Sequence, residues 1–397
     1  MEVVGMVKTV NFFRLSSIAL IFCADSLIAQ EQLQPTGFLA EVVTEAGYDD
    51  NILRTAESFE RSDSYFQVRP ELSLTGIYGK HRFQTLYEGQ YAFYKKYDEV
   101  NYNDHQLELN ATFDHTYSLN SMITAGYQRQ HEEPGDTDRI FNNFNEFNIF
   151  EKMFGDFRVI YGRDDSVGKL VFAYRRSDID YKNNDQDFRD RTEDRFMGRF
   201  FYRMATNTRV LAEAIYMVSD HEEISGQFER DNDNIILRTG LTWDYSGLLT
   251  GELKVGYQKR DYDFEQAIDS NGLSYEAEIE WLPTNYSTWT LNARRLTIDS
   301  SIAEAGGFLR SLYSLEMNHK LSDSTKIYAV AQYTDDELLT RTGRQDNSYA
   351  ARVTLTHKLN RLFEVGFGAS HEKRNSNFEA ATYESSSIKA TVKLILD

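Results

Sequence analysis

Apolar and polar residues alternate along most of the chain, the pattern of β-strands whose two faces meet different surroundings. In residues 388–396 the apolar side chains occupy every second position, and Lys389, Thr391 and Lys393 lie between them. The same alternation runs through residues 253–260, 349–359 and 363–370. No segment carries a 3.6-residue apolar stripe of helical length. The pattern predicts an all-β protein.

Short turns and longer polar connections also alternate along the chain. We expect eight tight turns, near residues 79–80, 119–120, 164–166, 205–208, 246–248, 283–285, 322–324 and 360–361. Eight hairpins, with one strand before them (about 37–48) and one after them (about 383–396), give about eighteen strands, with sixteen as the alternative. An even count places both chain termini on the short-turn side, as in outer-membrane barrels. No connection clearly exceeds about 15 residues, which argues against a long loop folded into the pore.

The strand ends before several short turns share a motif in which His or Trp follows an apolar residue by two positions. Its period of about 40 residues would also suit a β-propeller blade. A blade needs four short strands, whereas two strands of about 12–16 residues fill each period here, enough to cross a bilayer at a tilt. We therefore predict a transmembrane antiparallel up-and-down β-barrel with short periplasmic turns and longer outer loops. The motif predicts a ring of side chains at the membrane interface: His115, Trp243, Trp281, His319 and His357.

The first 29 residues have the order of a secretory signal peptide. Lys8 and Arg14 stand before an apolar stretch at residues 15–24. Ala29 then offers a small side chain at a cleavage position. A short buried helix is the alternative. We expect residues 1–29 to be removed and residues 30–397 to form the barrel domain. Cys23 is the only cysteine, so the mature chain would have no disulfide and no thiol chemistry.

Composition alone would suggest a different protein. The 397 residues carry a formal net charge of −19 and 41% hydrophobic residues, and the length suggests two or three soluble domains. No apolar run reaches about 18 residues, which excludes a helical membrane protein. A barrel with a polar lumen needs an apolar residue only at every second position, and it tolerates few prolines. Pro70 falls inside a predicted strand, where we expect a bulge or a membrane-edge position.

Several stretches resemble a known family. Residues 47–54 (GYDDNILR), 102–106 (YNDHQ) and 174–181 (YRRSDIDY) occur in order, with an Arg69–Pro70 strand after the first. In these stretches the chain resembles the beta-barrel porin-2 family, outer-membrane barrels often encoded with exopolysaccharide or capsule synthesis genes. The resemblance implies the outer membrane of a Gram-negative bacterium and a role in passing a secreted polysaccharide, with no catalytic residues to carry over. Such barrels commonly end in an aromatic residue associated with insertion, whereas this chain ends in Asp397.

Strand parity assigns a group of charged side chains to the lumen. The basic members fall on neighbouring strands in the middle of the chain: Arg175, Arg195, Arg199, Arg203, Arg238, Lys254, Arg260 and Arg294. One strand beside them carries Glu276, Glu278 and Glu280. A basic wall could guide an anionic polysaccharide by charge attraction and bidentate contacts. The alternative, which we favour, is that opposite charges pair and brace the barrel.

The eight histidines indicate neither catalysis nor metal binding, because no pair has a spacing such as H-E-x-x-H. A lipase would need Ser and His together on the outer face, and the acidic residues 185–194 do not match the twelve-residue calcium loop. We expect no enzymatic activity, cofactor, metal or nucleic-acid partner. The expected partners are outer-membrane lipid, lipopolysaccharide, an anionic polysaccharide, periplasmic export components and the barrel-insertion machinery. A surface-interaction barrel and a general diffusion porin are the alternatives to an export conduit.

Overall fold

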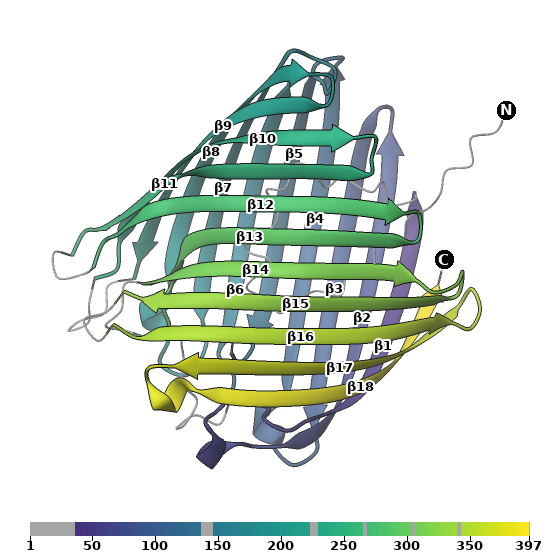
Figure 1. Cartoon of the computed structure of the whole chain (residues 1–397), viewed down its shortest axis with the longest axis vertical. Coiled ribbons are helices and arrows are strands. Elements are labelled where there is room, and N and C mark those ends of the chain that lie inside the picture. The colour runs from purple at the N-terminus through teal and green to yellow at the C-terminus, as the bar shows by residue number, and fades with distance from the viewer. Residues whose placement is uncertain are drawn as a thin grey trace.

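The computed structural model in Figure 1 describes residues 36–135, 146–222, 229–264, 268–302, 307–339 and 343–396. In this part of the chain, eighteen antiparallel strands form one closed barrel, because each strand pairs with its sequence neighbours and β1 also pairs with β18. Closure leaves no sheet edge, so every strand finds partners on both sides. In chain order the strands are β1 (Gly37–Asp49), β2 (Asp63–Tyr78), β3 (His81–Tyr94), β4 (Tyr102–Thr116), β5 (Leu119–His131), β6 (Ile149–Tyr161), β7 (Gly168–Tyr181), β8 (Arg191–Ala205), β9 (Thr208–His221), β10 (Asn232–Tyr245), β11 (Leu249–Tyr262), β12 (Ser270–Thr284), β13 (Ser287–Asp299), β14 (Gly307–Lys320), β15 (Thr325–Leu338), β16 (Gln345–Lys358), β17 (Phe363–Ser376) and β18 (Tyr383–Leu396).

The predicted all-β barrel of eighteen strands is confirmed. The long connections hold four single-turn 3-10 helices within the described residues: η3 (Glu57–Phe59), η4 (Asp98–Val100), η5 (Asp187–Arg189) and η6 (Glu379–Ala381). No helix in the described ranges is long and apolar enough to span a membrane. The predicted signal peptide, residues 1–29, lies outside the described residues, as does Cys23.

Six of the eight short turns lie at their predicted positions, and two are displaced by about two residues along the chain. The β4–β5 turn is Tyr117–Ser118 rather than 119–120, and a register shift between Asp114 and Thr116 directly precedes it. The β12–β13 turn is Asn285–Tyr286, and Pro283 belongs to β12 at the register shift that precedes this turn. A proline is tolerated there because the ladder is already irregular.

Pro70 does not create the bulge that its sequence position suggested. On one side it pairs with Val42 of β1 in an unbroken register. On the other side the β2–β3 pairing stops after Val68 and resumes at Glu71 in the same register. Pro70 therefore interrupts the β2–β3 pairing locally without inserting an extra residue, as expected from a residue that lacks an N–H donor.

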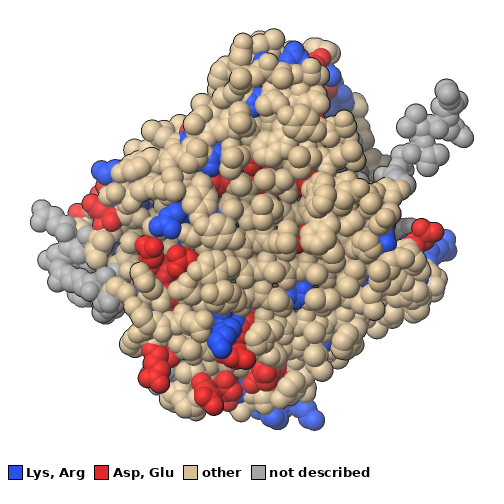
Figure 2. Space-filling view, in the orientation of Figure 1, with Lys and Arg blue, Asp and Glu red and all other residues tan. Residues whose placement is uncertain are grey.

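The two faces of the wall differ in chemistry. Large apolar side chains such as Leu237, Leu253 and Leu355 are exposed on the outer face. Their sequence neighbours on the inner face, among them Arg238 and Lys254, are polar or charged. Figure 2 shows one side of the barrel as a broad uncharged surface with most charged side chains toward its margins. This is the arrangement of a barrel that contacts lipid outside and water inside.

Candidate site in the barrel lumen

A network of buried ion pairs lines the inner face of β8 to β12. Glu213 of β9 accepts hydrogen bonds from Arg199 of β8 and from Nε of Arg238 of β10, the latter at 2.7 Å. Arg238 continues to Glu276 of β12, with 2.8 Å between Nη1 and Oε2. Nζ of Lys254 completes the network, at 2.9 Å from Glu276 and 3.6 Å from Glu213. The side chains of Arg199, Glu213 and Lys254 are 0% exposed.

The predicted basic wall therefore carries acidic and basic side chains that alternate with one another. Four of the predicted lumen residues belong to the network, and the carboxylates of Glu213 and Glu252 join them, with Glu252 2.8 Å from Lys254. Sequence analysis missed these two acids, although both stand at inward positions of alternating strands. Removing one partner from such a network would leave a buried charge without compensation. The contacts thus support bracing as the role of this group.

The other predicted lumen residues lie around the network rather than in it. Arg175 faces Asp156 of β6 at 3.4 Å and stands opposite Arg195 in register. Arg294 stands opposite Glu276, whereas Arg260 lies toward the loop end and donates to the carbonyl oxygen of Thr297 at 3.2 Å.

Three predicted residues remain near the network or the turns. Arg203 is opposite Arg209 near the β8–β9 turn. Glu278 stands opposite Glu252, and Glu280 opposite Thr250. The prediction that the eleven lumen side chains line the pore and influence ion flow stays a prediction.

An apolar cluster stiffens the same wall from inside. Met197, Phe201, Leu211 and Ile215 are buried against one another on β8 and β9, together with Val171 of β7. Their burial stabilises the wall by the hydrophobic effect even though they belong to the inner face. This part of the lumen lining is thus packed core rather than a water-lined surface.

Two loops extend from the wall over the lumen. Loop L3 is the β5–β6 connection (residues 132–148), and loop L4 is the β7–β8 connection (residues 182–190). L3 has 17 residues, so the expectation that no connection clearly exceeds about 15 residues is wrong. Residues 136–145 of L3 lie outside the described residues.

Arg189 of L4 links loop L3 to a distant part of the wall. Its guanidinium makes two hydrogen bonds to Glu132 of L3, at 2.8 and 3.0 Å. The same group lies 3.5 Å from Asp299 at the end of β13, five strands along the wall from β8. Arg230 holds the other oxygen of Asp299 at 2.7 Å. We call Glu132, Arg189 and Asp299 the cross-lumen strap.

The strap is buried and tightly coordinated. Arg189 is 4% exposed, and its guanidinium carbon lies 4.2 Å from the ring centroid of Tyr181. Tyr181 also donates to Glu132 at 3.0 Å, and Asn148 donates to it at 2.7 Å. Burial by itself would raise the pKa of Glu132, but the Arg189 guanidinium and these hydrogen bonds hold that pKa below its ordinary value. Glu132 is therefore a carboxylate at neutral pH, which keeps the strap closed.

L3 also reaches the opposite side of the barrel. The side chain of Arg374 of β17 donates to the carbonyl oxygen of Gly135, which lies six strands from β17 through the β1–β18 seam. Glu133, two residues before Gly135, is half-buried, and this burial by itself would raise its pKa. His131, Arg54 and Arg352 lower that pKa below its ordinary value. L3 and L4 together thus connect walls that are far apart around the barrel, and this narrows the lumen.

The start and end of L3 are anchored by aromatic packing at the mouth of the barrel. The rings of Tyr102 and His131 stack with centroids 3.7 Å apart, and Phe147 lies 5.1 Å from His131. Ile52 and Leu53 of the β1–β2 loop are buried in the same cluster. The described ends of L3 are therefore fixed to the wall rather than free in solvent.

The five predicted interface side chains all lie in the last residues of a strand that ends in a short turn. Trp281 is exposed, as are His115 and His357, while Trp243 and His319 are half-buried. Sequence analysis missed Trp289, which stands opposite Trp281 across β12 and β13. A second outer band follows near the loop ends, where neighbouring rings of Tyr275, Tyr313, Tyr333 and Tyr349 lie 5.1–6.2 Å apart. Two aromatic bands flank the apolar surface of membrane barrels.

A closed eighteen-strand wall, an apolar exterior with aromatic bands and a charged interior crossed by loops define a porin-type outer-membrane barrel. Residues 38–395 match the family described as Putative beta-barrel porin 2, and the chain belongs to that family. The comparison with curated protein sequences found no match.

Solved structures show the same fold at low sequence identity. OpdK of Pseudomonas aeruginosa, crystallised with vanillate, has a TM-score of 0.51 and 10% identity over 90% of this chain and 99% of that chain. OccK2 (OpdF) of the same organism has a TM-score of 0.50 and 9% identity, covering 91% of this chain and 100% of that chain. A BenF-like porin of Pseudomonas fluorescens has a TM-score of 0.50 and 8% identity, covering 90% and 99%. These similarities establish the architecture alone.

Proposed function

We propose that this barrel is an outer-membrane channel for hydrophilic solutes and that its cargo is an exported exopolysaccharide or capsular polysaccharide. The observation that carries the channel is a closed wall with a polar inner face and a lumen narrowed at one end by the cross-lumen strap. A polar lumen lowers the cost of moving a hydrated solute across the bilayer. The proposal includes no catalytic step, since the family is one of porins.

Hydroxyl groups on the inner face support a glycan as cargo. They form a strip along β16 to β18: Ser348, Thr354, Ser370, Ser385, Ser387 and Thr391. Ser370 and Ser387 already exchange a hydrogen bond of 2.7 Å, and Ser385 donates to Asp49 at 2.9 Å. Small hydroxyl side chains can exchange such bonds with the many hydroxyls of a sugar chain.

The export proposal brings partners with it. Lipopolysaccharide and outer-membrane lipid would surround the apolar exterior, and the barrel-insertion machinery would place the chain in the membrane. Periplasmic export components would deliver the polysaccharide to the short-turn side.

A second candidate is a channel for small solutes. The observation that favours it is the strap itself, because Arg189 joins Glu132 and Asp299 and so divides the mouth. The OpdK structure was determined with vanillate, a small carboxylate, which makes a small anion a plausible solute class for a barrel of this architecture. A small anion would pass beside the strap, whereas a polymer would need the strap to open.

Two measurements test these proposals. Deletion of the gene should reduce secreted polysaccharide at unchanged cell growth, and the wild-type gene should restore it. Unchanged secretion would rule out the export role. Swelling of liposomes that contain the purified barrel then separates the candidates. Entry of galactose with exclusion of a galactose oligomer points to the small-solute channel, and entry of neither contradicts both.

A further inference from the structure

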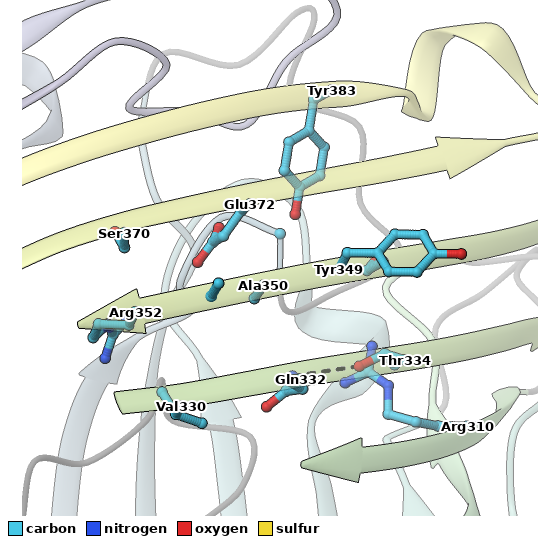
Figure 3. A pocket seen from close by; sticks show the side chains of 13 residues that line it. Arg310, Val330, Gln332, Thr334, Tyr349, Ala350, Arg352, Ser370, Glu372 and Tyr383 are labelled. Atoms are coloured by element: carbon cyan, nitrogen blue, oxygen red, sulfur yellow. Dashed lines mark hydrogen bonds between the residues drawn. The ribbon is translucent and has the colours of Figure 1, made fainter. Parts of the chain in front are cut away.

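A small cavity lies in the lumen between loop L3 and the inner face of β14 to β18. Its volume is about 60 Å³, and Gly135 of L3 forms one side of it. Figure 3 shows Arg352, Ser370 and Glu372 around it, on β16 and β17, with Gln332 of β15 below and Tyr383 of β18 above. This volume is roughly that of two water molecules, so it admits a carboxylate group with its oxygens inward.

Most charged groups around this cavity are already saturated. Arg310 makes a bidentate pair with Asp336, at 2.7 Å from Nε to Oδ1 and 2.6 Å from Nη2 to Oδ2. Glu372 accepts a hydrogen bond of 2.9 Å from Arg54, which also holds Asp49 at 2.8 Å. These groups have little capacity left for a ligand.

Arg352 differs from these neighbours. Among the residues that the structure describes, its guanidinium makes no close ion pair and no side-chain hydrogen bond, although it lines the cavity, is only half-exposed and acts at longer range on the Glu133 carboxylate of L3. A guanidinium presents two parallel N–H donors that match the two oxygens of a carboxylate. Hydroxyls of Ser348 and Ser370 and the amide of Gln332 line the same cavity and can bond sugar hydroxyls.

We propose that Arg352 is a binding subsite for the carboxylate of a hexuronic acid unit, with Ser370 and Gln332 contacting the hydroxyls of the same sugar. This inference rests on the channel proposed above and names the solute class that the channel retains. The anion-binding side of the lumen is then β15 to β17. Arg199 of β8 and Arg238 of β10 are excluded from this role because Glu213 and Glu276 neutralise their charges.

The experiment measures block of single-channel current in planar bilayers that contain the purified full-length barrel. Galacturonate is the probe, and galactose is the uncharged comparison. In the wild-type protein we expect galacturonate to reduce the current at concentrations at which galactose has no effect. Arg352→Gln should raise the half-blocking concentration about ten-fold, and Arg352→Lys should raise it less, since charge remains but the planar fork is lost.

Arg361→Gln is the matched control. It removes the same charge from the exposed β16–β17 turn, at the short-turn end of the same strand pair. We expect its half-blocking concentration to equal that of the wild type. An equal rise in both variants would mean that overall charge governs the block, and the subsite would be wrong.

The outcome separates this inference from the channel proposal. Equal block by galacturonate and galactose in a conducting wild-type barrel overturns the subsite and leaves the channel standing. If the barrel does not conduct, the channel proposal fails. Equilibrium binding of galacturonate to the detergent-solubilised barrel then tests the subsite directly, with binding lost in Arg352→Gln as the supporting result and unchanged binding as the overturning one.

Discussion

The guanidinium of Arg189 makes two hydrogen bonds to the carboxylate of Glu132, a residue 57 positions away in the sequence. The first group belongs to the β7–β8 loop and the second to the β5–β6 loop. Because Arg189 also contacts Asp299 of β13, one buried cation holds three parts of the barrel mouth together. Arg189 therefore joins loops L3 and L4 to the end of β13 at this level of the barrel.

Replacing Arg189 by Met should widen the mouth. The apolar side chain keeps most of the volume but loses both carboxylate contacts, so loop L4 is no longer tied to Glu132 and Asp299. We expect single-channel conductance to rise about two-fold, since conductance follows the narrowest section of a pore. Arg163→Met serves as control because Arg163 lies in the exposed β6–β7 turn, away from the strap. Equal conductance in wild type and Arg189→Met would show that the strap is not the narrowest point.

Acidification should loosen the same strap. The pKa of Glu132 is lowered in the folded protein, so its contribution to stability is present above the ordinary glutamate value of about 4.3 and disappears as pH falls through the lowered value. Conductance of the wild type should therefore increase only as pH falls below about 4.3. Burial raises the pKa of the neighbouring Asp190 to about 6, so its titration would appear at higher pH. A rise of the same size in Arg189→Met would assign the effect to other groups.

Glu213→Gln should weaken the barrel wall without changing its apolar core. The substitution removes the charge that faces Arg199, Arg238 and Lys254, two of which are fully buried. Breaking a buried ion pair from one side costs about 3–5 kcal/mol, and we expect a loss near the lower end in urea unfolding from lipid vesicles. Glu280→Gln is the control, since Glu280 lies on the inner face of β12 without an ion pair to a described residue. A loss below about 1 kcal/mol for Glu213→Gln would contradict a bracing role.

Gly256 of β11 should tolerate no side chain. A Cβ atom there would lie 1.8 Å from the carbonyl oxygen of Leu237 on β10, so the two strands would have to separate. We expect Gly256→Ala to lower stability by about 1–3 kcal/mol, the usual cost of overpacking. At Gly198 of β8 a Cβ would meet nothing within 4 Å, so Gly198→Ala should fold like the wild type. Heat resistance of the folded band in gel electrophoresis compares the two variants.

The sequence determined the wall of this protein. Alternation is a local property, since successive side chains of a strand point to opposite faces whatever the strand pairs with. The eighteen strands, the first strand at Gly37 and the last at Tyr383–Leu396 could therefore be predicted, as could the place of His357 and Trp281 beside short turns. The displaced β4–β5 turn is the kind of error that remains, because a register shift depends on the partner strand.

The tertiary structure decided which charges pair inside the barrel and which loops meet over the lumen. Parity placed Arg199 inside, but only the pairing of β8 with β9 brought Glu213 against it and turned a basic patch into a neutral network. Arg189 and Glu132 lie in loops without periodicity, so their contact appears only when the barrel closes and brings the loops over one lumen. Arg352 had an inward position in the sequence pattern as well, yet its lack of a close ion pair among the described residues depends on which side chains surround it in space. The alternation within a single strand determines which side chains point into the barrel. Contacts between strands and loops that are distant in the chain determine the charge balance and the pore width.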